Sequence, residues 1–215
     1  MTAARRGRRR SEPAGPRYPT GNPRVRFVEA EVLSADWYVL RKLTFDYARR
    51  DGSWSRESRE TYDRGNGATI LLYDESRGTV LLTRQFRCPA YVNGHRDGML
   101  IEAAAGLLDG QDAEAAIRRE AEEETGVRVG SVTKLFELFM SPGSVTERLA
   151  FYVGPYDAAR RVSGGGGVVG EGEDIEVLEL SLDDALARVE SGEIVDAKTV
   201  LLLQWADRNA PGRPC

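Results

Sequence analysis

Cysteine, histidine and lysine are all scarce in this chain of 215 residues, which contains two cysteines, one histidine and three lysines. The cysteines, Cys88 and Cys215, allow at most one disulfide, and neither has the companions that a zinc site needs. The histidine, His95, lies in a polar turn without the partners of a histidine-based catalytic triad. This composition argues against a disulfide scaffold and predicts a reducing, cytoplasmic setting.

Long hydrophobic runs are also missing. No apolar segment approaches the ~20 residues of a membrane-spanning helix, and the basic N-terminus lacks the apolar core of a secretory signal. Hydrophobic residues make up 41% of the chain and charged residues 30%. We therefore expect a globular protein without a membrane partner.

Positive charge is concentrated at the N-terminus. Residues 1–17 contain six arginines and one glutamate, a net charge of +5, whereas the whole chain carries −4 and the remainder therefore −9. An acidic body argues against nucleic acid as a partner. The arginine-rich segment alone is compatible with a solvated tail or with weak contacts to phosphates.

Proline, glycine and charge divide the chain into four segments. Four of the nine prolines precede residue 24, so residues 1–24 are predicted to form a flexible leader, and residues 210–215 a flexible tail. Residues 25–64 are rich in short strand signals and are expected to form a small β subdomain. In residues 65–209, strand and helix patterns alternate, which predicts a mixed α/β domain.

The expected elements follow from hydrophobic periodicity. Strands are expected over residues 25–33, 37–47, 59–62, 68–73, 80–86, 132–139, 149–153 and 175–180, and helices over 112–126, 182–189 and 197–208. Asp112 is a predicted helix N-cap, and Gly126 a predicted left-handed stop. Residues 163–172 contain six glycines and no phosphate-loop lysine, so they are predicted to form a flexible loop.

Three glutamates are predicted to share one face of the 112–126 helix. Glu120, Glu123 and Glu124 are spaced i, i+3 and i+4, whereas Glu122 points elsewhere. Like charges so arranged destabilise a helix unless the face is solvated or holds a divalent cation. The spacing alone leaves both interpretations open.

The surroundings of these glutamates resemble the Nudix hydrolase box, G-x5-E-x7-R-E-U-x-E-E-x-G-U, where U is aliphatic. From Arg119 onward the match is complete, with Ala121 at the aliphatic position. Before Arg119 the chain departs from the pattern in two ways. The acid that follows Gly106 after five intervening residues is Asp112 instead of a glutamate, and six residues instead of seven separate Asp112 from Arg119.

The resemblance extends over roughly residues 26–205 and is to the GDP-mannose hydrolase branch of the Nudix enzymes. Further runs that carry it are Tyr62–Ala68, Arg84–Arg87, Val92–Gly94, Lys134–Glu147, Glu173–Leu180, Gly192–Ile194 and Lys198–Leu203. It implies an α/β/α sandwich with a mixed sheet and a small N-terminal antiparallel β subdomain. It also implies hydrolysis of the pyrophosphate bond of a nucleoside diphosphate sugar, with GDP-mannose as the first candidate substrate. The implied cofactor is Mg²⁺, for which Mn²⁺ can substitute.

The resemblance also assigns roles to residues. The implied metal ligands are the carbonyl of Ala105 and the carboxylates of Glu120, Glu123, Glu124 and Glu173. Glu120, Glu124 and Glu173 are implied to be catalytic, with Glu171 as the rival of Glu173 for orienting the attacking water. The implied substrate contacts are Tyr38, Arg59, Glu60, Arg87, Ala105, Gly106, Leu107, Glu147 and Lys198. Arg119 and Gly126 are implied to be structural.

Several alternatives stay open at this point. Arg87 is also compatible with a structural ion pair, and Lys198 with an ordinary surface position. The family resemblance implies a homodimer in which the N-terminal strands complete the partner's active site. ADP-ribose pyrophosphatase is the alternative activity, and a non-catalytic nucleotide-binding Nudix-like module is the alternative of another class.

Overall fold

The computed structural model describes residues 18, 21–157, 161–168, 170 and 172–209, and these form two units. The first unit comprises the described residues up to Arg64 together with Ser141–Glu147. The second comprises Gly65–Met140 and the described residues from Arg148 onward. Most of the predicted leader and the whole predicted tail lie outside the described residues.

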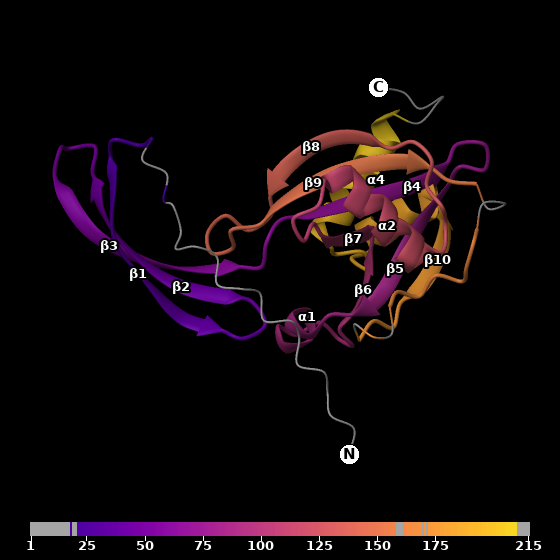
Figure 1. The fold of residues 1–215 in the computed structure, drawn as a ribbon. Coiled ribbons are helices and arrows are strands. Elements are labelled where there is room, and N and C mark those ends of the chain that lie inside the picture. Colours follow the sequence, from indigo (N-terminus) through magenta and orange to yellow (C-terminus); the bar gives the residue numbers. More distant parts are fainter. Residues whose placement is uncertain (1–17, 19–20, 158–160, 169, 171, 210–215) are drawn as a thin grey trace, which may run out of the picture. The chain divides into compact units, whose positions relative to one another are not determined.

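The first unit is a three-stranded antiparallel sheet, coloured indigo to purple in Figure 1. Its strands, in the order β1-β2-β3, are β1 (Val25–Ala35), β2 (Val39–Ala48) and β3 (Trp54–Asp63). β3 begins five residues before the expected position 59, because it pairs with β2 along its whole length, from Ala48 opposite Trp54 to Val39 opposite Asp63. The predicted small N-terminal antiparallel sheet is confirmed.

The second unit contains a mixed sheet of seven strands. The strands are β4 (Gly67–Asp74), β5 (Thr79–Phe86), β6 (Met99–Glu102), β7 (Ala104–Leu107), β8 (Thr133–Phe139), β9 (Arg148–Pro155) and β10 (Glu176–Ser181). The order is β10-β5-β4-β9-β8, with β6 paired to β5 and β7 to β4. β4 and β9 are parallel, and the other pairs are antiparallel.

Helices cover both faces of this sheet. The helices described in this unit are α1 (Cys88–Val92), α2 (Ala113–Thr125), α3 (Leu182–Glu190) and α4 (Ala197–Asn209), and of these the short α1 buries no residue. Successive residues of β4 point to opposite faces, so Ile70 packs in one buried cluster with Ile117 of α2, and Leu71 packs in the other with Leu202 of α4. Figure 1 shows α2 in front of the sheet and α4 behind it. The predicted α/β/α architecture with a mixed sheet is confirmed.

Three short elements were not expected from the sequence, namely α1, β6 and β7. The stretch from Met99 to Leu107 reads as an apolar run of small residues, and its two strands form because β5 and β4 offer them edges. Within the described part of the chain, no helix is long and apolar enough to cross a membrane.

Candidate active site

Helix α2 presents the candidate acidic side chains, and its two ends are where the sequence predicts them. The carboxylate of Asp112 accepts hydrogen bonds from the backbone N–H groups of Glu114 (3.0 Å) and Ala115 (3.1 Å). Gly126 ends the helix in the left-handed region, with φ 74°. The apolar face, which includes Ile117 and Ala121, is buried against the sheet. This packing fixes the rotation of α2 and thereby the direction of its glutamates.

Glu124 is the most deeply buried acid on this helix, with 2% of its surface exposed. Its Oε2 accepts a hydrogen bond from the backbone N–H of Ala105 at 3.3 Å. Burial and the neighbouring carboxylate of Glu173 raise the pKa of Glu124 to about 8, against partial compensation from the Ala105 hydrogen bond. An acid in such surroundings is stabilised by a proton or by a bound cation.

Glu120 lies one turn before Glu124 and is half-buried. Burial raises its pKa, and the adjacent Arg119 partly counters that rise through a 2.7 Å ion pair. Strand β7 lies beside it, and Gly106 on that strand leaves room for the Glu120 side chain. The backbone of Ala105, Gly106 and Leu107 is aligned along β4, opposite Thr69, Ala68 and Gly67. β7 and α2 thus bring the predicted backbone and carboxylate ligands together.

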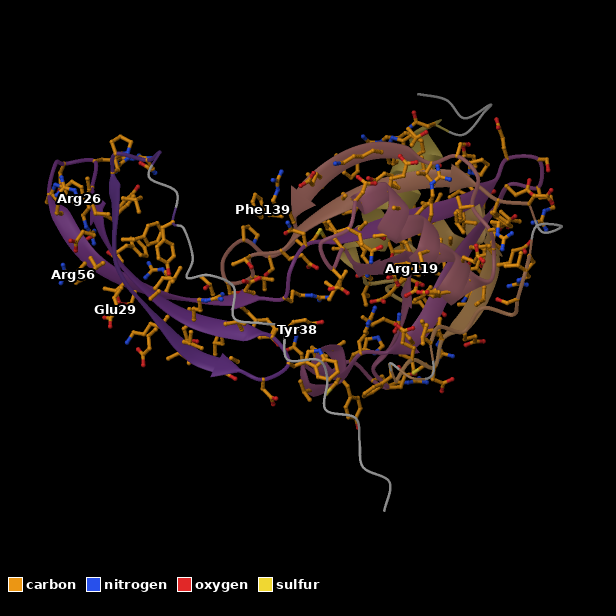
Figure 2. The ribbon with its side chains drawn as sticks, in the orientation of Figure 1. Arg26, Glu29, Tyr38, Arg56, Arg119 and Phe139 are labelled. Carbon is orange, nitrogen blue, oxygen red and sulfur yellow. The ribbon has the colours of Figure 1, made fainter. Side chains whose placement is uncertain are left out.

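Arg119, labelled in Figure 2, projects from α2 and contacts residues on both sides of it along the chain. Its guanidinium donates to Gln111 Oε1 in the preceding loop (3.1 Å) and to Glu120 Oε1 (2.7 Å). It also lies 3.7 Å from Glu123 Oε2. The arginine therefore connects the loop before the helix to two of its acids.

The glycine-rich loop is bonded to the end of α2. The backbone N–H of Gly166 donates to the carbonyl of Glu124 (2.9 Å), and that of Gly167 donates to the carbonyl of Glu123 (3.1 Å). The last carbonyls of a helix have no partner within the helix, so these bonds supply donors that α2 lacks. Gly165 and Gly167 adopt φ values of 69° and 77°, which favour glycine.

This loop also delivers Glu173 to the acids of α2. Glu173 is partly buried, its Oε2 accepts a 2.8 Å hydrogen bond from the N–H of Val168, and its charge contributes to the raised pKa values of Glu120 and Glu124. A Cβ on Gly167 would lie 2.5 Å from Glu173 Oε2. Glu171, the rival candidate, lies outside the described residues.

These donors fit a hard divalent cation by their chemistry. Carboxylate and carbonyl oxygens are the ligands that Mg²⁺ prefers, and the crowding of Glu120, Glu124 and Glu173 is a repulsion that a cation would relieve. Within the residues that the structure describes, no group of three or more acidic, histidine or cysteine side chains is arranged so that it could hold a metal ion. The acids instead accept bonds from protein donors, such as Arg119 and the N–H of Ala105.

Two family models match the chain. The model described as the NUDIX domain matches residues 63–203, which is more than half of the chain. The chain belongs to the Nudix family. A second model, described as the N-terminal domain of the GDP-mannose pyrophosphatase NudK, matches residues 24–62. The resemblance drawn from the sequence is thereby confirmed, and Nudix hydrolases generally use a divalent metal ion.

Curated relatives match along nearly their whole length, and each of the following three is named GDP-mannose pyrophosphatase. The protein from Pectobacterium atrosepticum is 56% identical over 182 residues, which cover 85% of this chain and 93% of the relative. That from Klebsiella pneumoniae is 55% identical over 84% of this chain and 90% of its own. That from Salmonella typhimurium is 54% identical over 84% of this chain and 94% of its own.

The departure of this chain from the Nudix box has a local structural counterpart. Asp112 stands where the Nudix pattern has a glutamate, and it serves here as the N-cap of α2. Aspartate is among the preferred N-cap residues because its short side chain reaches the first free N–H groups of a helix. The shorter acid, Asp112, therefore accepts the hydrogen bonds of the first free N–H groups of α2.

Two of the predicted substrate contacts meet at one buried acid of the Nudix domain. Arg87 donates to Glu102 Oε2 from Nε (3.0 Å) and Nη2 (2.5 Å). Lys198 Nζ lies 3.4 Å from Glu102 Oε1 and 3.0 Å from Asp196 Oδ2. Glu102 is not among the site residues expected from the sequence, although a lone acid within the apolar run Leu100–Leu108 is a signal that could have identified it.

In the first unit, Tyr38 and Glu147 are joined by Arg64, which is not among the site residues expected from the sequence. The guanidinium of Arg64 lies 5.7 Å from the centre of the Tyr38 ring. Its Nε lies 3.4 Å from Glu147 Oε1. Tyr38, labelled in Figure 2, also packs edge-on against Tyr62, with 5.7 Å between the ring centres.

Arg59 and Glu60 are neighbours on β3 and therefore point to opposite faces of the first sheet. Arg59 is opposite Leu43, on the face that also carries Phe27 and Phe45. Glu60 is opposite Lys42, on the polar face. Figure 2 labels Arg26, Glu29 and Arg56, and the strand register places all three on this polar face. Of these two predicted substrate contacts, Arg59 therefore lies on the face that carries Phe27 and Phe45, and Glu60 lies on the opposite, polar face.

Proposed function

We propose that this protein hydrolyses the pyrophosphate bond of GDP-mannose, releasing GMP and mannose 1-phosphate. The observation that carries this proposal is the 54–56% identity to curated GDP-mannose pyrophosphatases. That identity covers 84–85% of this chain, and the family model of the NudK N-terminal domain matches residues 24–62, which include the N-terminal sheet. The acids of α2 support the same reaction, since a polyanionic substrate approaches an acidic site only with cations.

We propose Mg²⁺ as the resident cation, with Mn²⁺ as a substitute. The carbonyl of Ala105 and the carboxylates of Glu120, Glu124 and Glu173 would hold it, with Glu123 as a nearby or water-mediated ligand. When bound, the ion neutralises phosphate charge, polarises phosphoryl oxygens and lowers the pKa of water. The buried position of Glu124 supports this assignment, because an uncompensated buried carboxylate is costly.

Glu173 is the proposed acceptor of the water proton, with Glu171 as the alternative. In this step the water oxygen bonds to one phosphorus, the bond from that phosphorus to the bridging oxygen breaks, and the proton passes to the carboxylate. The 2.8 Å bond from the N–H of Val168 supports a fixed direction for one Glu173 oxygen. In this proposal the other oxygen would accept the proton of the water.

Arg87 and Lys198 are the proposed phosphate contacts of the chain itself, together with the backbone of Ala105, Gly106 and Leu107. A guanidinium can bond two phosphate oxygens at once, and a lysine ammonium adds a point charge. The 39% exposure of the Arg87 side chain supports access to a ligand. Tyr38, Arg59, Glu60 and Glu147 are the proposed contacts to the rest of the nucleotide sugar.

We also propose a homodimer with shared active sites. One face of the first sheet carries large apolar side chains, and Phe27 and Val32 on that face are 36% and 52% exposed. Exposed apolar patches on a small sheet commonly mark an interface. Light scattering should give twice the monomer mass of 23.7 kDa. If sites are shared, co-expression of inactive Arg59→Ala and Glu124→Gln chains should restore part of the activity.

The deciding experiment offers the purified protein GDP-mannose, GDP-glucose, ADP-ribose and ADP-glucose with Mg²⁺, and identifies the products. We expect preferential release of GMP and mannose 1-phosphate. Preference for ADP-ribose would overturn the substrate, since guanine and adenine present different hydrogen-bond edges. Binding of nucleotide sugar by the wild type without turnover would instead indicate the non-catalytic module.

The setting of this reaction is also a proposal. The low cysteine content supports a cytoplasmic location. The acidic body supports a small-molecule substrate without nucleic acid as a partner, and we expect no membrane partner. Fractionation of cells that produce the protein, followed by activity measurement in each fraction, tests this expectation.

A further inference from the structure

The carboxylate of Glu102 is buried between the two proposed phosphate contacts. Its side chain is 4% exposed, and each of its oxygens faces a different cation. Oε2 accepts both hydrogen bonds from Arg87, and Oε1 lies 3.4 Å from Lys198 Nζ. The carboxylate of Glu102 therefore contacts both the guanidinium of Arg87 and the ammonium of Lys198 and lies between them.

The backbone around Glu102 is fixed on both sides. Glu102 is opposite Thr83 in the sheet, and its carbonyl accepts a 3.2 Å hydrogen bond from Thr83 Oγ1. The next N–H, that of Ala103, donates to the buried Thr199 Oγ1 at 2.7 Å. Thr199 follows Lys198 on α4, so strand β6 and helix α4 are joined at this point.

Asp196 completes the arrangement from the start of α4. Its Oδ2 lies 3.0 Å from Lys198 Nζ and accepts bonds from the hydroxyl (2.6 Å) and N–H (3.1 Å) of Thr199. Lys198 is thus held by two acids, and its side chain is only 12% exposed. A lysine with such little freedom has lost its rotamer entropy before any ligand arrives.

Stability alone is a weak reason for this network. The free energy needed to remove two charges from water offsets much of the Coulomb attraction in a buried ion pair. Well-packed apolar residues of similar size therefore often stabilise a fold at least as well. A network that orders two cations in advance does have a benefit for binding, because the ligand then meets groups already in place. Glu102 is the side chain that contacts both of these cations, Arg87 and Lys198.

We propose that Glu102 is a positioning residue for the pyrophosphate of the substrate, which sets the separation and direction of Arg87 and Lys198. This inference rests on the proposed function, in which those two residues bind phosphate. Glu102 acts through them, and it is itself neither a proposed metal ligand nor a proposed contact of the reacting atoms.

The test is Glu102→Gln, which keeps the size of the side chain but replaces one acceptor oxygen with an NH₂ donor. The amide satisfies only one of the two cations, so we expect KM for the nucleotide sugar to rise about tenfold with kcat nearly unchanged. The Mg²⁺ concentration for half-maximal activity should not change. Glu179→Gln on β10, which weakens one of the two ion pairs of Arg77, is the matched control and should leave KM unchanged.

Calorimetric titration with inorganic pyrophosphate and Mg²⁺ separates this inference from the proposed function, because it needs no turnover. Arg87→Ala and Lys198→Ala should each weaken pyrophosphate binding, and unchanged binding in both would refute their proposed role. If those variants bind weakly while Glu102→Gln binds like the wild type, only the positioning role is refuted. Added to the Arg87→Ala/Lys198→Ala double variant, Glu102→Gln should have no further effect.

Glu102→Asp provides a second, independent test in case the glutamine variant does not fold. It keeps the charge and withdraws the carboxylate by one methylene. If position matters, this variant should also raise KM, whereas a wild-type KM would contradict the proposal. Melting temperatures of all variants, measured without ligand, show which changes reflect loss of structure.

Discussion

A Cβ atom on Gly106 would lie 2.7 Å from Oε1 of Glu120, closer than real Cβ atoms approach other groups. The glycine on β7 therefore gives the Glu120 carboxylate its place beside the strand. The backbone φ of Gly106 is not in the left-handed region, so the requirement for glycine here comes from this contact.

Gly106→Ala should consequently displace the Glu120 side chain without preventing folding. We expect kcat/KM for GDP-mannose to fall on the order of 10²-fold, as a displacement of about 1 Å at a catalytic centre does. Steady-state kinetics and circular dichroism check this. Gly143→Ala, where nothing lies within 4 Å of the added carbon, is the control, and equal activities of the two variants would contradict the interpretation.

The glycine loop offers a pair of adjacent variants with opposite expectations. At Gly165, with φ 69°, a Cβ would lie 2.7 Å from the carbonyl carbon of Thr125, whereas nothing lies within 4 Å at Gly164. Gly165→Ala should therefore destabilise the protein by at least roughly 1–2 kcal/mol and reduce activity. Gly164→Ala should be close to neutral. Urea denaturation measures both, and similar values would show that the loop does not need its close approach to α2.

Glu124 should limit stability while it supports activity. In the folded protein without metal, the buried Glu124 must either take up a proton or carry a charge next to Glu173 and Glu120, which burial and repulsion disfavour. Glu124→Gln removes this cost, so we expect a higher melting temperature than the wild type in EDTA near neutral pH. We also expect loss of the stabilisation by Mg²⁺ and a fall in kcat on the order of 10²–10³-fold. Glu122→Gln, which removes an exposed partner of Arg128, should change none of these. A Glu124→Gln variant that Mg²⁺ stabilises like the wild type would argue against its role as a ligand.

The N-cap of α2 can be tested separately from the metal ligands. Asp112→Ala removes the acceptor of the N–H groups of Glu114 and Ala115, and should lower the free energy of unfolding by about 1 kcal/mol. Asp112→Asn, which keeps an acceptor, should lower it much less. Denaturant unfolding gives both numbers. Equal losses in the two variants would mean that the capping bonds contribute little.

The bounds of α2 were predictable because both of its end signals are local. Asp112 bonds to residues two and three positions later, and Gly126 ends the helix through its own backbone conformation. The shared face of Glu120 and Glu124 follows from the helical period alone. For the same reason, these parts of the candidate site are predictable from the order of the residues.

The remaining parts of the site depend on contacts between distant segments. Strand β6 exists because residues 83–86 pair with residues 99–102, and a run of small apolar residues does not specify that pairing. The sequence next to Glu102 does not indicate its two cationic partners, because Arg87 follows β5 and Lys198 lies on α4. The described residues of the loop 163–172 belong to none of the named helices or strands, as the glycine content predicts, but that content does not indicate that the loop's N–H groups bond to α2.

The bonds between the glycine loop and α2 also impose an order on biosynthesis. Helix α2 leaves the ribosome well before Gly166 and Gly167, which donate to its last carbonyls. Glu173 and the edge strand β10 emerge later still. A nascent chain therefore exposes an acidic helix with an unfinished end until Gly166 and Gly167 have been translated and can donate to its carbonyls.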